Sequence, residues 1–352
     1  MTPVRVRAEI RALTAYPVSG CEDLTKLDAM ENPYQWPADM QEEWLDHLRG
    51  VPLNRYPDPT ASRLKQSLRD NLDIPGEMEI LLGNGSDELI QIIQLCTIDR
   101  DGVVVAPSPS FVMYEMTARF VGATFVGVPL AADYSIDEDA MLRAIDDHDP
   151  AVVFLAYPNN PTGNLFDRGI MDRIIRRARG LVVVDEAYHA FSETSYVDQI
   201  GSHDNLVVMH TLSKLGLAGL RLGYLIGPAA WLKEFDKVRM PYNINVLTQR
   251  TVEFALQKMD VFERQASQII SQRRRLYTFL KSRAGVTPYP SQANFILFRS
   301  DGLPASELFD QLVAQGILVK SFSQAGSGLD RCLRVSVGTA EENDAFMAAL
   351  DK

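Results

Sequence analysis

The middle of the chain alternates short apolar segments with amphipathic stretches. The apolar segments are rich in β-branched or aromatic residues, and most end at Gly, Pro, Asn or Asp. They are Val103–Val105, Thr124–Val128, Val152–Leu155, Leu181–Val184, Leu206–Met209 and Tyr224–Ile226. Helix-like stretches lie between several of them, at Asp87–Cys96, Met113–Phe120, Asp137–Ile145 and Asp167–Arg179. Strands that are apolar on both faces and separated by helices predict an α/β domain, with a largely parallel sheet covered on both sides.

The pattern changes after Pro241. Residues Thr248–Ala284 predict one long helix. The elements expected after it are a strand at Phe295–Phe298, a helix at Ala305–Gln315, strands at Ile317–Val319 and Leu333–Val337, and a last helix from Glu341. We therefore expect a large domain over residues 46–240 and a smaller α+β domain over residues 241–352. Residues 1–45 have few periodic apolar positions, and we expect them to form an arm that packs on the smaller domain.

Composition narrows the class of protein. The 352 residues are 46% apolar, enough for the cores of two domains. The net charge of −11 argues against a nucleic-acid partner. The three cysteines, Cys21, Cys96 and Cys332, are too far apart for a disulfide framework, and neither they nor the five histidines have metal-ligand spacing. Because no signal peptide and no apolar run of about 20 residues is visible, we expect a cytoplasmic protein without a membrane span.

Polar motifs follow four of the predicted strands, at the point where each strand ends. They are the segments 107–111, 157–163, 185–188 and 211–214. Ligands of open α/β sheets bind beyond the carboxyl ends of the strands, so these four segments predict one site.

Single residues in these motifs have two interpretations each. A partly buried Asp185 needs a cationic partner or becomes neutral, although a helix N-cap explains it equally well. Lys214 alone could be a solvated surface lysine. Ser86 and Asp87 follow a Gly-rich turn and open a helix whose free N–H groups could bind phosphate, but helix capping also fits. Arg221 could be a second anion ligand or a surface arginine.

Together the motifs resemble the fold type I pyridoxal-phosphate enzymes, and among them the histidinol-phosphate aminotransferases. Eight segments occur in the family's order over nearly the whole chain: KLDAMENPY, NRYPDP, GNGSDELI, PSPSFVMY, YPNNPTGN, VVVDEAY, TLSKLGLAGLRLGY and LRVSVGT. The resemblance implies a fold type I transferase. Such a protein has a large domain with a mainly parallel seven-stranded sheet between helices, and a smaller α+β domain.

The resemblance also implies roles around pyridoxal 5′-phosphate. Lys214 would hold the cofactor as a Schiff base and move the proton of the reacting carbon. Asp185 would pair with the ring nitrogen, and Asn160 and Tyr188 would donate to the phenolate oxygen. Phe111 would stack on the ring face. Lys214, Asp185 and Tyr188 are thus the expected catalytic residues.

The phosphate and substrate groups of the site are implied in the same way. The expected phosphate ligands are Ser86, Asp87, Thr211, Ser213 and Arg221. Tyr56 would reach the phosphate of a neighbouring subunit, which implies a homodimer with shared active sites.

Arg334 matches the family's anion clamp, and Tyr16 and Asn32 lie in segments expected to cover the substrate. Lys320 departs from the family pattern, because many relatives carry Arg near this position. A lysine offers a point charge without the guanidinium fork. The spacing from Lys214 to Arg221 is one residue shorter than in many relatives.

The implied reaction transfers an amino group from L-histidinol phosphate to 2-oxoglutarate, giving imidazole acetol phosphate and L-glutamate, a step of histidine biosynthesis. Two alternatives use the same cofactor: an aminotransferase for aromatic or other amino acids, and a decarboxylase of a phosphorylated amino acid. A cofactor-binding regulator without turnover is a further alternative. A compact helix-turn-helix in residues 1–45 would favour it.

Overall fold

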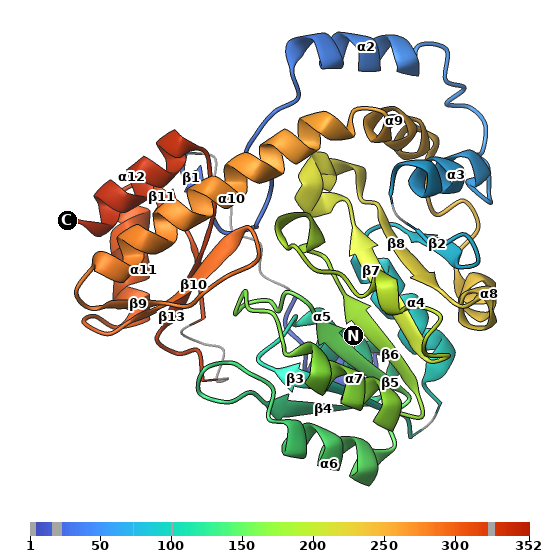
Figure 1. The fold of residues 1–352 in the computed structure, drawn as a ribbon, viewed down its shortest axis with the longest axis horizontal. Helices are drawn as coiled ribbons and strands as arrows, with labels where there is room; N and C mark the ends of the chain where they lie inside the picture. The colour runs from blue at the N-terminus through green and yellow to red at the C-terminus, as the bar shows by residue number, and fades with distance from the viewer. Residues whose placement is uncertain (1–4, 16–22, 73, 100, 323–327) are drawn as a thin grey trace.

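A seven-stranded sheet forms the centre of the protein (Figure 1). The computed structural model describes residues 5–15, 23–72, 74–99, 101–322 and 328–352. The strand order is β2-β8-β7-β6-β5-β3-β4. Their bounds are β2 Glu79–Gly83, β3 Val103–Ser108, β4 Thr124–Pro129, β5 Val152–Ala156, β6 Leu181–Asp185, β7 Leu206–Thr211 and β8 Gly223–Gly227. Strands β3 to β7 are parallel and β8 is antiparallel to β2 and β7, which confirms the predicted mainly parallel sheet.

Helices cover both faces of this sheet, because successive side chains of its strands point to opposite faces. Val153 and Leu155 of β5 pack in one core, whereas Val152 and Phe154 pack in another. The first core includes helices α3 Ser62–Asn71, α6 Glu138–His148, α7 Arg168–Arg177 and α9 Val246–Leu256. The second includes α4 Ser86–Thr97, α5 Met113–Val121 and α8 Ala229–Val238. Fully buried strands between two helical layers explain the continuous apolar runs of the sequence.

A second sheet of four antiparallel strands, in the order β12-β13-β10-β9, lies at the carboxyl-terminal side of the chain (Figure 1). Its strands are β9 Val286–Pro288, β10 Phe295–Ser300, β12 Lys320–Ser321 and β13 Cys332–Ser336. The accompanying helices are α10 Met259–Ser282, α11 Ala305–Ala314 and α12 Ala340–Leu350. A capping box at Thr339 and Glu342 fixes the start of α12.

The amino-terminal segment contacts both parts of the molecule. Its strand β1 (Thr25–Lys26) pairs in parallel with β11 (Ile317–Leu318), and helix α2 (Ala38–Leu48) lies against α9. Helix α1 is the short segment Ala8–Arg11. Helix α10 joins the two cores: Phe262 packs in the core of the large sheet, and Leu276 packs in that of the smaller sheet. The domain limits at residues 45 and 240 stay a prediction.

The prediction of one helix over Thr248–Ala284 is wrong. The chain forms α9 and α10 there, and Lys258 between them has a non-helical backbone, with φ −120° and ψ 31°. Helix α9 is buried on most sides against α2 and α3, whereas α10 leaves it and runs toward the smaller sheet (Figure 1). The break follows from packing in two directions and has no Gly or Pro to announce it.

Candidate active site

The carboxyl ends of β5, β6 and β7 and the amino-terminal end of α4 surround one cavity of about 110 Å³. Ten residues predicted for the cofactor line it: Ser86, Asp87, Phe111, Asn160, Asp185, Tyr188, Thr211, Ser213, Lys214 and Arg221. Parallel strands bring their carboxyl ends to one edge, so segments more than 100 residues apart in sequence meet here. Within the described ranges, no group of three or more His, Cys, Asp or Glu residues could hold a metal.

One end of the cavity is suited to a phosphate group. Arg221 reaches it from a backbone in the left-handed region, at φ 50°. Its Nη1 donates to Ser213 Oγ over 3.3 Å, and its Nη2 contacts Asp87 Oδ2 at 3.3 Å. Thr211 Oγ1 donates to Ser213 Oγ over 3.0 Å. Hydroxyls, a guanidinium and the first N–H groups of α4 together match the acceptors of a phosphate.

Gly85 makes this end of the cavity possible. It is the N-cap residue of α4 and has φ 85°. A Cβ atom at this position would lie 2.5 Å from Arg221 Nη2, so any side chain would displace the guanidinium. The Gly-rich turn is therefore needed for the close approach of Arg221 to the helix start.

Asp185 ends β6 and is buried, with 4% of its surface exposed. Burial raises the pKa of its carboxyl to about 6, against the lowering effect of two hydrogen bonds. These come from the Tyr114 hydroxyl to Oδ2 (2.6 Å) and from the Ala187 N–H to Oδ1 (3.1 Å). A buried carboxylate of this kind lacks only a cation, and a protonated ring nitrogen would supply one.

Lys214 lies on an irregular π-turn, η3 (Ser213–Leu217), directly after β7. Its Nζ donates to the carbonyl oxygen of Ala29 over 3.1 Å. Burial and the charge of Arg334 lower the pKa of this amine to about 8. An amine with such a pKa is partly unprotonated at neutral pH, as a nucleophile or a general base must be.

A chain of polar contacts connects the cofactor cavity to the predicted anion clamp. The Tyr188 hydroxyl donates to Met30 Sδ over 3.2 Å and accepts from Asn160 Nδ2 at 3.1 Å. Arg334, on β13, donates from Nη1 to Asn160 Oδ1 over 2.6 Å and from Nη2 to the Asp28 carbonyl over 2.8 Å. Arg334 is buried and adjoins the cavity through Asn160.

Lys320 on β12 is the cross-strand partner of Arg334. Burial and the charge of Arg334 lower the pKa of the Lys320 amine. The two cations therefore lie close together on neighbouring strands, an arrangement suited to binding an anion.

The structure does not bring every predicted residue to the cavity. Asn32 donates to the Leu215 carbonyl (2.8 Å) and to Gln265 Oε1 (2.9 Å), so its amide holds the lysine-bearing turn in place. Tyr56 is 80% exposed and stacks on Tyr242. Substrate contact by Asn32 and phosphate contact by Tyr56 stay predictions. Tyr16 lies outside the described residues.

Five residues that line the cavity were not predicted from the sequence: Met30, Tyr114, Ala156, Pro158 and Ala187. Tyr114 and Met30 are the two whose side chains bond to predicted site residues, Asp185 and Tyr188. Tyr114 lies three positions after Phe111 in the quoted segment PSPSFVMY, one helical turn away, and this spacing could have indicated it. Met30 has φ 55°, and its backbone is held by the Ser336 hydroxyl and the Asn294 amide of the smaller part. No local pattern marks such a residue.

The residues present fit pyridoxal 5′-phosphate. The end near Arg221 offers phosphate donors, Asp185 offers a carboxylate for a ring nitrogen, and Lys214 offers an amine. Phe111 provides an aromatic face, and Asn160 and Tyr188 provide donors for a phenolate oxygen.

The model of the family "Aminotransferase class I and II" matches residues 22–350. The chain belongs to this aminotransferase family. A protein named histidinol-phosphate aminotransferase 2, from Nitrosococcus oceani, is 51% identical over 98% of this chain and 96% of its own length. This class I and II aminotransferase thus matches its relative over nearly the full length of both.

Solved structures agree with this family. The histidinol-phosphate aminotransferase of Sinorhizobium meliloti in complex with pyridoxal-5′-phosphate has a TM-score of 0.87 at 25% identity, over 98% of this chain and 96% of that one. The L-threonine-O-3-phosphate decarboxylase of Porphyromonas gingivalis has a TM-score of 0.78 at 22% identity, over 93% and 98% of the two chains. That second likeness concerns the fold alone. The aminotransferase has the fold type I architecture that the sequence predicts.

Proposed function

We propose that the protein transfers the amino group of L-histidinol phosphate to 2-oxoglutarate, with pyridoxal 5′-phosphate as its cofactor. The observation that carries the proposal is one cavity that gathers Lys214, Asp185 and the phosphate-binding groups. Arg334 adjoins this cavity through Asn160, and Lys320 is the cross-strand partner of Arg334. The full-length relative with that name, at 51% identity, supports the choice of substrate.

Each residue has a defined task in this proposal. Bound pyridoxal phosphate supplies a carbonyl that carries the amino group and a ring that accepts electrons from the reacting carbon. The Asp185 carboxylate would hold a proton on the cofactor's ring nitrogen. The Lys214 amine, with its pKa lowered to about 8, would accept the proton of the reacting carbon at Nζ and later donate it. Tyr188 and Asn160 donate to the phenolate oxygen.

The substrate's anionic group would be bound by Arg334 and Lys320. Histidinol phosphate has a phosphate and no carboxylate, whereas glutamate has carboxylates and no phosphate. The same cations must therefore accept both anions in turn. Arg334 provides a planar fork and Lys320 a point charge, and a dianionic phosphate gains from both.

A homodimer with shared active sites belongs to the same proposal. Five large apolar or aromatic residues are exposed on two neighbouring segments: Leu53, Tyr56, Met240, Tyr242 and Leu247. The rings of Tyr56 and Tyr242 are stacked, with centroids 4.4 Å apart. An exposed patch of this kind is typical of a protein interface, and a two-fold axis would let one patch cover its copy.

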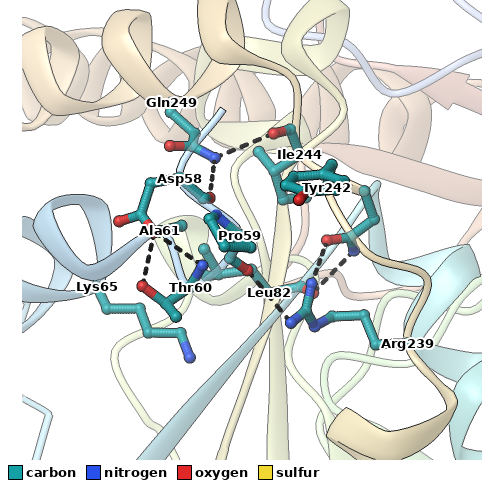
Figure 2. Close-up of a pocket in the computed structure, with 11 residues that line it drawn as sticks. Asp58, Pro59, Thr60, Ala61, Lys65, Leu82, Arg239, Tyr242, Ile244 and Gln249 are labelled. Carbon is teal, nitrogen blue, oxygen red and sulfur yellow. Dashed lines mark hydrogen bonds between the residues drawn. The ribbon is translucent and has the colours of Figure 1, made fainter. Parts of the chain in front are cut away.

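Contacts beside this patch hold its two segments together (Figure 2). Gln249 Nε2 donates to the carbonyl oxygens of Asp58 and Ile244, both over 3.0 Å. Arg239 Nη2 donates to the Pro59 carbonyl over 3.3 Å. The backbone that presents Tyr56 is therefore fixed before any partner binds. Such preorganisation favours association.

A cytoplasmic location is also part of the proposal. Cys96 and Cys332 are free thiols, as expected in a reducing compartment. Among the described helices, none is long and apolar enough to cross a membrane.

A panel of amine donors with 2-oxoglutarate tests the activity, with glutamate formation and carbon dioxide release followed together. We expect histidinol phosphate to be the preferred donor and unphosphorylated histidinol to be poor. A preference for phenylalanine or tyrosine would replace the proposal with an aromatic aminotransferase. Carbon dioxide release from a phosphorylated amino acid would indicate a decarboxylase, and cofactor binding without turnover would indicate a regulator.

A further inference from the structure

Tyr114 lines the cavity, and its hydroxyl donates to the Asp185 carboxylate. Its side chain is fully buried, and the donor–acceptor distance is 2.6 Å. Burial and the adjacent Asp185 hold the pKa of the Tyr114 hydroxyl well above its usual range. The hydroxyl therefore stays protonated and acts as a donor at every physiological pH.

The ring of Tyr114 is fixed on both sides. It stacks on Phe154 of β5, with centroids 4.5 Å apart and planes 7° from parallel. Phe111 meets it edge-on, with centroids 5.6 Å apart and planes at 87°. Its backbone carbonyl accepts a hydrogen bond from the buried Gln94 amide at 3.2 Å. With its hydroxyl bonded to Asp185, its ring packed on Phe154 and Phe111 and its backbone bonded to Gln94, Tyr114 is suited to positioning its neighbours.

We infer that Tyr114 is a positioning residue for the aminotransferase reaction. Its hydroxyl orients the Asp185 carboxylate toward the cofactor's ring nitrogen, and its ring holds Phe111 at the ring face. One side chain thereby fixes the two groups that contact the cofactor ring from its edge and from its face. With Oδ2 held by Tyr114 and Oδ1 held by the Ala187 N–H, the carboxylate has a single orientation.

The hydroxyl also affects the charge of Asp185. Four groups act on this carboxylate: Tyr114 from α5, the Ala187 N–H after β6, Asp87 from α4 and His210 from β7. Asp87 raises the pKa of Asp185, whereas the other three lower it. A carboxylate must be ionised to pair with a protonated ring nitrogen. Removal of the Tyr114 hydroxyl should therefore shift the pH dependence of cofactor binding upward.

Tyr114→Phe tests this inference, because it keeps both ring contacts and removes only the hydroxyl. We expect the dissociation constant of pyridoxal phosphate, measured by absorbance without any amine donor, to rise about tenfold or more at neutral pH, because a hydrogen bond to a charged group is lost. The acid limb of cofactor binding should move to higher pH. Tyr196→Phe is the matched control, since its buried hydroxyl contacts the Arg168 carbonyl and Asp172 instead.

A double-mutant cycle with Asp185→Asn separates positioning from a general packing role. In the Asn background, Tyr114→Phe should weaken cofactor binding much less than in the wild type, because the charged acceptor is absent. Fully additive losses, or a Tyr114→Phe protein with wild-type affinity and an unmoved acid limb, would overturn the inference. The outcome does not depend on the donor panel, so the substrate proposal and this inference can fail separately.

Discussion

Replacing Asp185 by Asn should stabilise the cofactor-free protein at neutral pH while it weakens cofactor binding. The carboxyl is buried, and its pKa in the folded chain is about 6, against an ordinary value of 3.8. The folded state therefore holds this proton more tightly than the unfolded state. The stability that the buried, protonated carboxyl provides is complete below about pH 3.8 and is lost as the pH rises to about 6.

The size of the effect follows from the same difference. A pKa difference of about 2, at about 1.4 kcal/mol per pKa unit, corresponds to about 3 kcal/mol of lost unfolding free energy above pH 6. An Asn side chain carries no charge and can still accept from the Tyr114 hydroxyl. We therefore expect Asp185→Asn to gain up to about 3 kcal/mol at pH 7.5 and almost nothing at pH 4.

Urea unfolding of cofactor-free wild type and variant, at equal protein concentration and several pH values, measures this difference. Asp167→Asn is a suitable control, because Asp167 caps α7 and Asn caps a helix as well as Asp does. A variant less stable than wild type at pH 7.5 would refute the reasoning. So would a gain of equal size at pH 4 and pH 7.5. With cofactor bound, the order should reverse, since wild type regains a cation for its carboxylate.

Four further outcomes are expected. Borohydride reduction of the yellow holoenzyme should fix the cofactor on Lys214, and Lys214→Ala should still bind cofactor without transamination; labelling of another lysine would contradict the site. Arg334→Ala should lower affinity for histidinol phosphate and for glutamate about ten- to a hundredfold, and should hardly affect histidinol, as steady-state kinetics would show. Mixed Tyr56→Ala and Lys214→Ala chains should regain some activity through hybrid dimers, provided that Tyr56→Ala alone is severely impaired; a fully active monomer in solution would refute shared sites. His189 has its pKa lowered to about 3 by burial and by the adjacent His210, so it should favour unfolding by about 1.4 kcal/mol per pH unit as the pH falls from 6.5 toward 3. His189→Gln should remove that slope from acid unfolding curves.

The sequence by itself determined six of the seven strands of the large sheet, all except β2, and the chemistry of the sheet's edge. The apolar runs ending at Leu155, Val184 and Met209 correspond to β5, β6 and β7 within one or two residues. A fully buried strand must be apolar on both faces, so its own residues report its position. Parallel strands bring their carboxyl ends together, so the polar motifs after these runs predict one cavity at this edge of the sheet.

The tertiary structure decided what depends on contacts between distant segments. The break between α9 and α10 and the antiparallel direction of β8 have no local signal. The hydrogen bonds of the Asn32 amide to Leu215 and Gln265 have none either. The hydrogen bond from Tyr114 to Asp185 joins residues 71 positions apart. The spacing of apolar residues along a segment indicates which face of the segment packs in the core. It does not indicate which side chain of another element that face contacts. Specific partners are set by packing, which the folded chain alone defines.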